Sequence, residues 1–440
     1  MTNQVDLLNK IFISADPEEK YAPLGIKFNP FPKSGTTNIN GSDSLNQSLV
    51  PVNDETLAGL MDYLRHSMGE NPVDRDDRLL TLTVVGDYGR GKTQLLMFIK
   101  SLLTEASKQH RSGRNPYVIY VDNPGVSLLE FIGSIISRIG EENLRKFIWT
   151  KIIVHIEQNA EYRTELAKYE RQGLLFGNRD ANPFAAENLA SYKEFLGAFT
   201  SSIHTPKERK AFDEAFRRIL LRILDSETNN STISQYFCEF ISSDYGVNKA
   251  WEALSTGSIK QFNRKEAEII RYIVRLIKEQ NYTDFFILVD EFEDITKGRL
   301  TKAQIDNYIY NLRTLLDEHR DWSLVFSMTG EALKRLKSIS PPLTDRITNR
   351  LIILEALSSD EAQKIVRNYL SMARSQESEE GIYPFAATGI DELNQRVEGN
   401  TRRFLKSCFH LVEKASEDFS GDETIDQNFV KKYFLEESII

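Results

Sequence analysis

The sequence has few residues of the kinds that stabilise secreted or metal-binding domains. Only two of its 440 residues are cysteines, Cys238 and Cys408. This count excludes a disulfide framework, and we expect two free thiols buried in apolar helices. The six histidines follow no metal-ligand spacing with cysteine or carboxylate residues, so no metal cage is predicted.

The sequence also lacks long apolar runs and an excess of positive charge. No stretch approaches the ~20 apolar residues that span a bilayer, and the amino terminus does not have the pattern of a secretory signal. We therefore expect a cytoplasmic protein without a membrane partner. With 55 basic and 64 acidic residues the formal charge is −9, which argues against non-specific coating of nucleic acid but is compatible with a local basic patch.

Short apolar runs alternate with helical periodicity in two separate parts of the chain. Such runs predict buried strands at 79–85, 117–121, 285–289, 324–327 and 351–354. Helices are predicted after the first strand (94–107) and before the fourth (305–319), and another is expected to start at Asn53 or Asp54. Buried strands that alternate with helices indicate a mostly parallel sheet covered on both faces.

The remaining segments read as helix or loop, and they suggest a division of the chain. We expect an α/β fold with a three-layer αβα core, a large helical insertion interrupted by a polar break near 173–183, and a C-terminal helical lid. The predicted boundaries are an N-terminal extension or linker at 1–52, a core at 53–134 and 281–357, the insertion at 135–280 and the lid at 358–440.

A phosphate-binding pattern follows the first predicted strand and opens the next helix. It reads Gly-x4-Gly-Lys-Thr, the P-loop, whose glycines let backbone N–H groups surround phosphates. Lys92 is predicted to bind the β- and γ-phosphates of ATP, and the Thr93 hydroxyl to bind Mg²⁺. A tight turn with accidental spacing would leave this lysine as an unpaired charge beside a buried strand. The expected nucleotide ligands are Gly86, Asp87, Tyr88, Gly89, Arg90, Gly91, Lys92, Thr93 and Gln94.

Two adjacent acids end the apolar run at 285–289. Asp290 is the candidate carboxylate for Mg²⁺, and Glu291 the candidate general base that polarises the attacking water. For the next acids, Glu293 and Asp294, a solvated or helix-capping role is the simpler interpretation.

Taken together, these residues resemble the AAA+ ATPases, in particular the replication-initiator (origin-recognition-like) clade, the related STAND proteins, and bacterial relatives in transposition and phage defence. In this resemblance the strand at 324–327 leads to a sensor 1 residue that contacts the γ-phosphate or the lytic water. Thr329 is the first candidate and Ser327 the second, where the family prefers Asn. A threonine that only caps the next helix is the alternative.

Two arginine motifs complete the resemblance. The segment 345–351 (DRITNRL) looks like the box that supplies an arginine finger to the ATP of a neighbouring subunit, which makes Arg350 the candidate and Arg346 its alternative. The segment 399–404 (GNTRRF) is similar to sensor 2, and Arg402 matches the arginine that the lid offers to the γ-phosphate. Simple surface or packing roles remain open for both. Asn123 could restrain Glu291, or could be only a turn residue.

The resemblance implies a slow ATPase that works as a homo-oligomer through Arg350 supplied in trans. Its function would be that of a DNA-associated switch or motor in bacterial (antiviral) defence, transposition or replication. The alternative is a STAND-like signalling or scaffold ATPase whose insertion, 135–280, binds a protein partner without DNA. Basic stretches at 207–222 and 260–278 could contact DNA, but both contain acids and also fit solvated, ion-paired helix faces. The resemblance to AAA+ proteins ends near residue 420, and the about twenty residues after it are fewer than the winged helix of replication initiators needs.

Overall fold

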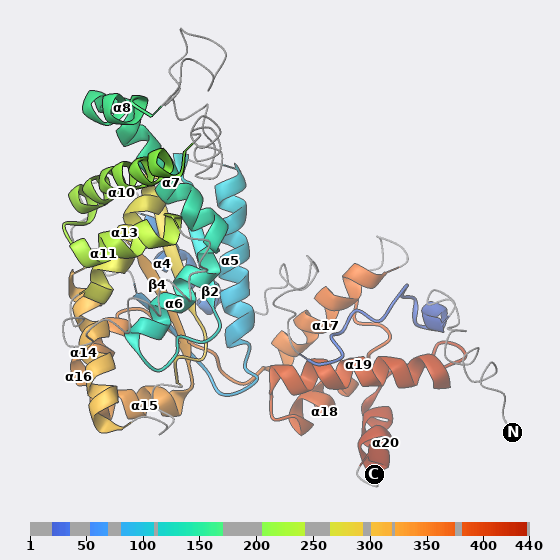
Figure 1. Ribbon diagram of the computed structural model, residues 1–440. Helices are drawn as coiled ribbons and strands as arrows, with labels where there is room; N and C mark the ends of the chain where they lie inside the picture. The colour runs from blue at the N-terminus through green and yellow to red at the C-terminus, as the bar shows by residue number, and fades with distance from the viewer. Residues whose placement is uncertain are drawn as a thin grey trace, which may run out of the picture. The chain divides into compact units, whose positions relative to one another are not determined.

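The computed structural model has an α/β fold built on one five-stranded parallel sheet (Figure 1). Residues 20–35, 53–68, 81–109, 113–169, 205–242, 265–293, 301–318, 322–374 and 381–437 are described. The strands are β1 (Thr81–Val85), β2 (Pro116–Val121), β3 (Asp284–Val289), β4 (Ser323–Met328) and β5 (Leu351–Ile353), in the order β2-β3-β4-β1-β5. The predicted fold class is confirmed.

Burial explains why these segments are strands. Every residue of β1, β3 and β4 is buried, as expected for strands covered on both faces, which read as continuous apolar runs. β1 pairs in parallel with β5 in the register Thr83↔Leu351 to Val85↔Ile353, and β2 pairs in parallel with β3 from Pro116↔Asp284 to Val121↔Val289.

The described residues fall into two compact units. The first holds the described residues within 1–72, 81–103 and 325–440, and the second those within 104–324. In the first unit, α4 (Asp54–Met68) begins after Asn53, whose side-chain Oδ1 accepts a hydrogen bond from the Thr56 N–H at 2.8 Å. This contact makes Asn53 the cap. The unit also holds the start of α5 (Lys92–Gln109), α15 (Gly330–Ile339) and α16 (Pro341–Ile347).

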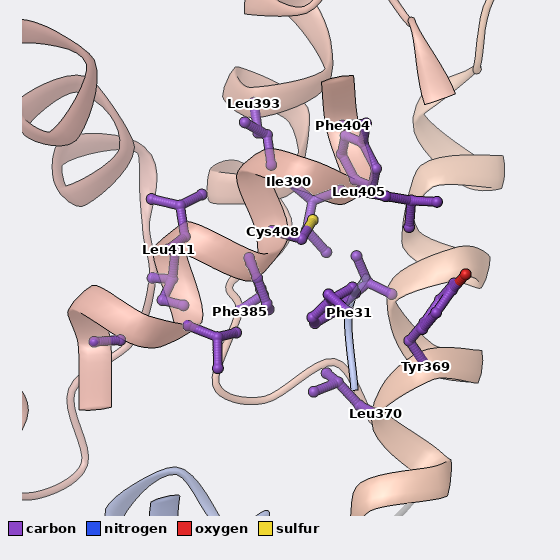
Figure 2. Packing of buried hydrophobic residues seen from close by; sticks show 14 of the residues in the cluster. Phe31, Tyr369, Leu370, Phe385, Ile390, Leu393, Phe404, Leu405, Cys408 and Leu411 are labelled. Atoms are coloured by element: carbon purple, nitrogen blue, oxygen red, sulfur yellow. The ribbon is translucent and has the colours of Figure 1, made fainter. Parts of the chain in front are cut away.

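Four helices at the C-terminal end of the first unit surround an apolar cluster: α17 (Ser359–Ala373), α18 (Ala387–Arg396), α19 (Thr401–Asp418) and α20 (Gln427–Glu437). Residues from the predicted N-terminal extension complete this cluster. Phe31 stacks on Tyr369 with ring centroids 5.3 Å apart and meets Phe385 edge-on at 5.8 Å (Figure 2). Part of segment 1–52 is therefore packed into the core of these four helices, α17–α20, which we call the lid.

Polar contacts fix the same N-terminal segment to α19 through Glu413. Its carboxylate accepts hydrogen bonds from Lys20 Nζ at 2.6 Å, Tyr21 Oη at 2.5 Å and Asn29 Nδ2 at 2.8 Å. Burial alone would raise the pKa of Glu413, but these hydrogen bonds outweigh it and lower the pKa below its ordinary value. The segment is thus held by both apolar and charged contacts.

The second unit is largely helical apart from β2 and β3. Its helices are α6 (Leu128–Ile139), α7 (Glu141–Gln158), α8 (Ala160–Ala167), α10 (Pro206–Thr228), α11 (Ser231–Ser242), α13 (Lys265–Glu279) and α14 (Lys302–Glu318). Glu227 of α10 is ion-paired with Lys151 of α7 and with Arg275 of α13, and lies at hydrogen-bond distance, 2.9 Å, from Nε2 of His155 in α7. The polar break near 173–183 lies outside the described residues, and the division into insertion and core stays a prediction.

Two sequence-based expectations concern the apolar content of the chain. Cys238 and Cys408 are buried thiols, as predicted, and burial raises the pKa of Cys408. Across the described ranges, no helix is both long enough and apolar enough to pass through a membrane.

Replacing Gly389 tests the packing of the lid. A Cβ at this position in α18 would overlap the Ile425 carbonyl, whereas a Cβ at Gly421 meets nothing within 4 Å. Alanine normally favours a helix by about 1 kcal/mol over glycine, but here the overlap reverses the sign. We expect Gly389→Ala to lower the free energy of unfolding by about 1–3 kcal/mol in urea titrations, and Gly421→Ala to leave it nearly unchanged. An unchanged stability for Gly389→Ala would contradict this packing.

Candidate functional site

The P-loop occupies the turn between β1 and α5. Gly89 and Gly91 have φ angles of 79° and 91°, a conformation that side chains with a Cβ rarely adopt. Where such residues alternate with residues of ordinary backbone conformation, successive backbone N–H groups can point into one concavity, which binds anions. The helix α5 begins at Lys92, and its N-terminus adds a partial positive charge of about half a unit at the same place.

Lys92 is held inside this loop. Its Nζ donates to the carbonyls of Gly86 at 2.8 Å and Asp87 at 3.3 Å, and lies 5.4 Å from the ring centroid of Tyr88. The lysine is buried, with 9% of its surface exposed, whereas Tyr88 is 63% exposed. Thr93 is half-buried and Gln94 buried at the start of α5. The Lys92 ammonium group is therefore held by backbone carbonyls of the loop itself.

The carboxyl end of β4 lies beside the start of the P-loop. The Gly86 N–H donates to the Met328 carbonyl at 3.2 Å, so Thr329 follows directly on the residue bonded to the loop. Thr329 is buried, and its Oγ1 accepts from the Ala332 N–H at 3.2 Å as the cap of α15. Accepting this bond leaves the hydroxyl hydrogen to donate elsewhere. Ser327, the second candidate, is fully buried within β4.

The start of α19 contacts the P-loop through its backbone and through Asn400. The Asn400 Oδ1 accepts from the Arg403 N–H at 3.1 Å, which caps the helix, and its Nδ2 donates to the Tyr88 carbonyl at 2.7 Å. The Arg402 N–H donates to the Gly89 carbonyl at 3.0 Å. A Cβ at Gly89 would overlap the Asn400 side chain. The structure thus brings the predicted sensor 2 segment to the P-loop.

Arg90 also contacts the lid. Its Nη1 donates to the carbonyls of Gly399 at 2.5 Å and Glu398 at 3.1 Å. The sequence predicted Arg90 only as a nucleotide ligand, because it lies within the P-loop pattern. It gave no sign of a lid contact for Arg90, and Asn400 was noted only as part of the sensor 2 motif.

The candidate finger residues lie at the other end of β1. The Thr83 N–H donates to the Arg350 carbonyl at 2.9 Å, and Thr81 Oγ1 donates to the Arg346 carbonyl at 2.6 Å. Arg350 is ion-paired with Asp62 of α4 at 3.1 Å, and its side chain is 47% exposed. No pattern in the sequence indicated Asp62 as a partner of Arg350.

In the second unit, Asp290 and Glu291 follow β3 as predicted. Asp290 is 3% exposed, and its carboxylate accepts from Tyr120 Oη at 2.8 Å and from the Glu291 N–H at 3.1 Å. Burial first, and then the charge and hydrogen bond of Asp290, raise the pKa of Tyr120. This tyrosine therefore remains a hydrogen-bond donor at neutral pH. Its role was not predicted, because tyrosine in a strand is an ordinary core residue.

Glu291 has an unusual backbone for a residue with a long side chain. Its φ angle is 52°, in the left-handed region, and its side chain is exposed. Non-glycine residues in this region cost energy and concentrate at functional sites. Glu293 is buried, which rules out the solvated interpretation of this residue, and Asp294 lies outside the described residues.

Asn123 lies at the end of β2 in a turn. Its Oδ1 accepts from the Gly125 N–H at 2.7 Å, the turn geometry that asparagine side chains favour. The neighbouring Asp122 is ion-paired with Arg138 of α6 at 2.6 Å. The interpretation of Asn123 as a turn residue therefore has a direct structural basis.

The arrangement of strand, loop and helix defines an α/β protein with a P-loop between β1 and α5. No family model and no curated protein matches the sequence. Two solved structures with a similar chain course come from Aeropyrum pernix: the ORC1 protein in complex with DNA and the ORC2 protein in ADPNP–ADP complexes. Sequence identity is 13% and 12%, and the TM-score is 0.42 for both. The match covers 90% of this chain and 67% and 72% of those chains. Likeness of this degree assigns no role to individual residues.

Replacing Tyr120 tests how Asp290 is held. Tyr120→Phe removes a hydrogen bond to a buried carboxylate, and we expect the free energy of unfolding to fall by about 1.5–3 kcal/mol. Tyr117→Phe is the matched control on the same strand, because the Tyr117 ring packs against Phe147, Tyr282 and Phe285. Urea unfolding of both variants measures the difference. Equal losses would show that the Tyr120 hydroxyl does not support Asp290.

Proposed function

We propose that this chain binds ATP with Mg²⁺ and hydrolyses it, as a P-loop ATPase of the AAA+ type. The observation that carries the proposal is the pair of positive-φ glycines, Gly89 and Gly91, directly before α5, with the buried Lys92 at the helix start. Backbone donors, a helix N-terminus and a cation at one point are suited to a triphosphate. The exposed Tyr88 and the contacting lid turn favour a site that a lid helps to form.

Each polar side chain has a role in this proposal. Lys92 binds the β- and γ-phosphates, Thr93 and Asp290 hold the metal ion, and Glu291 orients and deprotonates the attacking water. Mg²⁺ is bound in such sites by one or two carboxylates together with phosphates, rather than by a cage of protein ligands. A single buried carboxylate on Asp290 fits this requirement.

The lid and β4 supply the remaining groups. Arg402 is the cation that reaches the γ-phosphate from the first turn of α19, whose backbone bonds to the P-loop at Gly89. Thr329 is the sensor that contacts the phosphate or the lytic water, and its cap bond with Ala332 fixes its rotamer. Bound Mg²⁺ would neutralise charge on the phosphates during transfer.

Two substitutions separate binding from hydrolysis. We expect Lys92→Ala to abolish tight ATP binding, and Glu291→Gln to retain binding while lowering the hydrolysis rate at least about a hundredfold, the usual contribution of a general base. Lys108→Ala and Glu105→Gln, on the solvent side of α5, serve as controls. Fluorescent ATP titration and phosphate release measure the two steps. Full turnover by Lys92→Ala would refute the nucleotide site.

We further propose a homo-oligomer in which Arg350 completes the site of a neighbouring copy. The support is that the Arg350 carbonyl is bonded to Thr83 of β1, three residues before the P-loop begins at Gly86, and that the Arg350 side chain is half-exposed. Arg346 remains the alternative, but its Nη1 donates to the Pro342 carbonyl within its own helix at 2.8 Å.

The finger is tested by the dependence of the rate on protein concentration. We expect the ATPase rate per subunit of the wild type to rise with concentration, and Arg350→Ala to remove this rise by lowering the rate ~10³-fold in the assembled protein. Arg346→Ala is the matched comparison, and sedimentation confirms assembly of each variant. An unchanged rate of Arg350→Ala in a proven oligomer would exclude it as the finger.

DNA association and protein association are the two alternatives for the partner. Three of the four arginines of α10 favour a protein partner, since Arg217 is ion-paired with Glu239, Arg218 with Glu165 at 3.5 Å and Arg222 with Glu161 at 3.7 Å. Paired guanidinium groups are less available to phosphates than free ones. Addition of double-stranded DNA to the same concentration series decides between them: stimulation supports the DNA-associated switch, and indifference supports the scaffold ATPase.

A further inference from the structure

Arg90 meets the lid at a point suited to a cation. Helix α18 ends at Arg396, and Glu398 and Gly399 then adopt left-handed φ angles of 55° and 62°. The carbonyls in this turn lie at the negative end of the helix dipole, where positive side chains are favoured. One nitrogen of Arg90, Nη1, donates to both the Glu398 and the Gly399 carbonyls.

The same turn is also held by the connector between β5 and the lid, residues 354–358. The Gly399 carbonyl also accepts from the Leu357 N–H at 3.0 Å, and Asn394 Nδ2 donates to the Leu357 carbonyl at 2.8 Å. A Cβ at Gly399 would lie 2.9 Å from the Ala356 Cβ and from the Leu357 nitrogen. The turn therefore has little freedom to move unless the P-loop or the connector moves with it.

Immediately beyond this turn, the chain reaches the residues that contact the P-loop backbone. Asn400 donates to the Tyr88 carbonyl, and the Arg402 N–H donates to the Gly89 carbonyl. Three consecutive P-loop residues, Tyr88 to Arg90, thus contact the lid between Glu398 and Arg402. Of these P-loop residues, only Arg90 uses its side chain in these bonds.

We propose that Arg90 is a positioning residue that couples the P-loop to the lid, and that its guanidinium is not a phosphate ligand. It holds the Glu398–Gly399 turn so that Asn400 and the first turn of α19 stay on the P-loop, and it thereby sets the position of Arg402. The inference rests on the proposed ATPase for its catalytic consequence, but the coupling itself exists without nucleotide.

Hydrogen exchange measures the coupling directly and independently of ATPase activity. In the full-length protein without nucleotide, Arg90→Ala should make the amides of 398–403 exchange about tenfold faster, since a hydrogen bond to a charged donor is lost. The Arg402 amide is the most informative, because its acceptor is Gly89. Arg403→Ala, which removes an exposed charge from the same helix turn, is the control and should leave exchange unchanged. Arg90→Lys should restore part of the protection.

Kinetics then separate a positioning role from phosphate binding. If Arg90 acts through Arg402, Arg90→Ala lowers kcat with little change in ATP affinity, and adds nothing in an Arg402→Ala background. If Arg90 binds phosphate itself, the fold-losses in kcat of Arg90→Ala and Arg402→Ala multiply in the double variant, and the proposal fails. Unchanged exchange at 398–403 in Arg90→Ala would also overturn it, even with ATPase intact. A wild type that neither binds nor hydrolyses ATP would refute the proposed function, while the exchange result would still stand.

Discussion

The parallel pairing of β1 with β5 is the contact on which the rest of the first unit depends. Because the two strands run in the same direction, the segments that follow them leave the sheet at the same edge. One segment is the P-loop and the other is the connector to the lid. The Leu354 N–H extends the pairing to the Val85 carbonyl at 2.7 Å, and a Cβ at Gly86 would be 3.1 Å from the Leu354 Cβ. The three residues of β5 therefore place the start of the connector beside the P-loop, and the connector in turn contacts the Glu398–Gly399 turn of the lid.

The Asn400 side chain both caps a helix and contacts the P-loop. One side-chain oxygen caps α19, and the nitrogen of the same amide holds the Tyr88 carbonyl. Capping alone would accept serine, threonine or aspartate, but none of these can supply both the acceptor and the N–H₂ donor in this geometry. Toward the other end of β1, Arg350 is ion-paired with Asp62, so the candidate finger has a partner within its own chain that a contact with another subunit would have to replace.

The sequence predicted well those features that local chemistry determines. The strands 117–121 and 285–289 were found within one residue because they are apolar, β-branched and bounded by polar residues, and the P-loop because its spacing is demanding. The Arg90 and Asn400 contacts could not be predicted, since each joins residues about 310 positions apart. The packing of Phe31 in the lid was missed for the same reason: its surroundings, rich in proline and asparagine, read as loop, while the ring's partners lie near the other end of the chain.

The N-terminal segment that completes the lid has a consequence for the order in which this protein is made. Tyr21 and its partner Glu413 are separated by 392 residues, so Tyr21 leaves the ribosome long before the residue that it contacts. At the usual ~5–20 residues per second, the interval is roughly 20–80 s. Until Tyr369 and Phe385 have been made, the aromatic ring of Phe31 lacks both of these lid partners. A chaperone that recognises exposed apolar segments would therefore meet this one early and release it late.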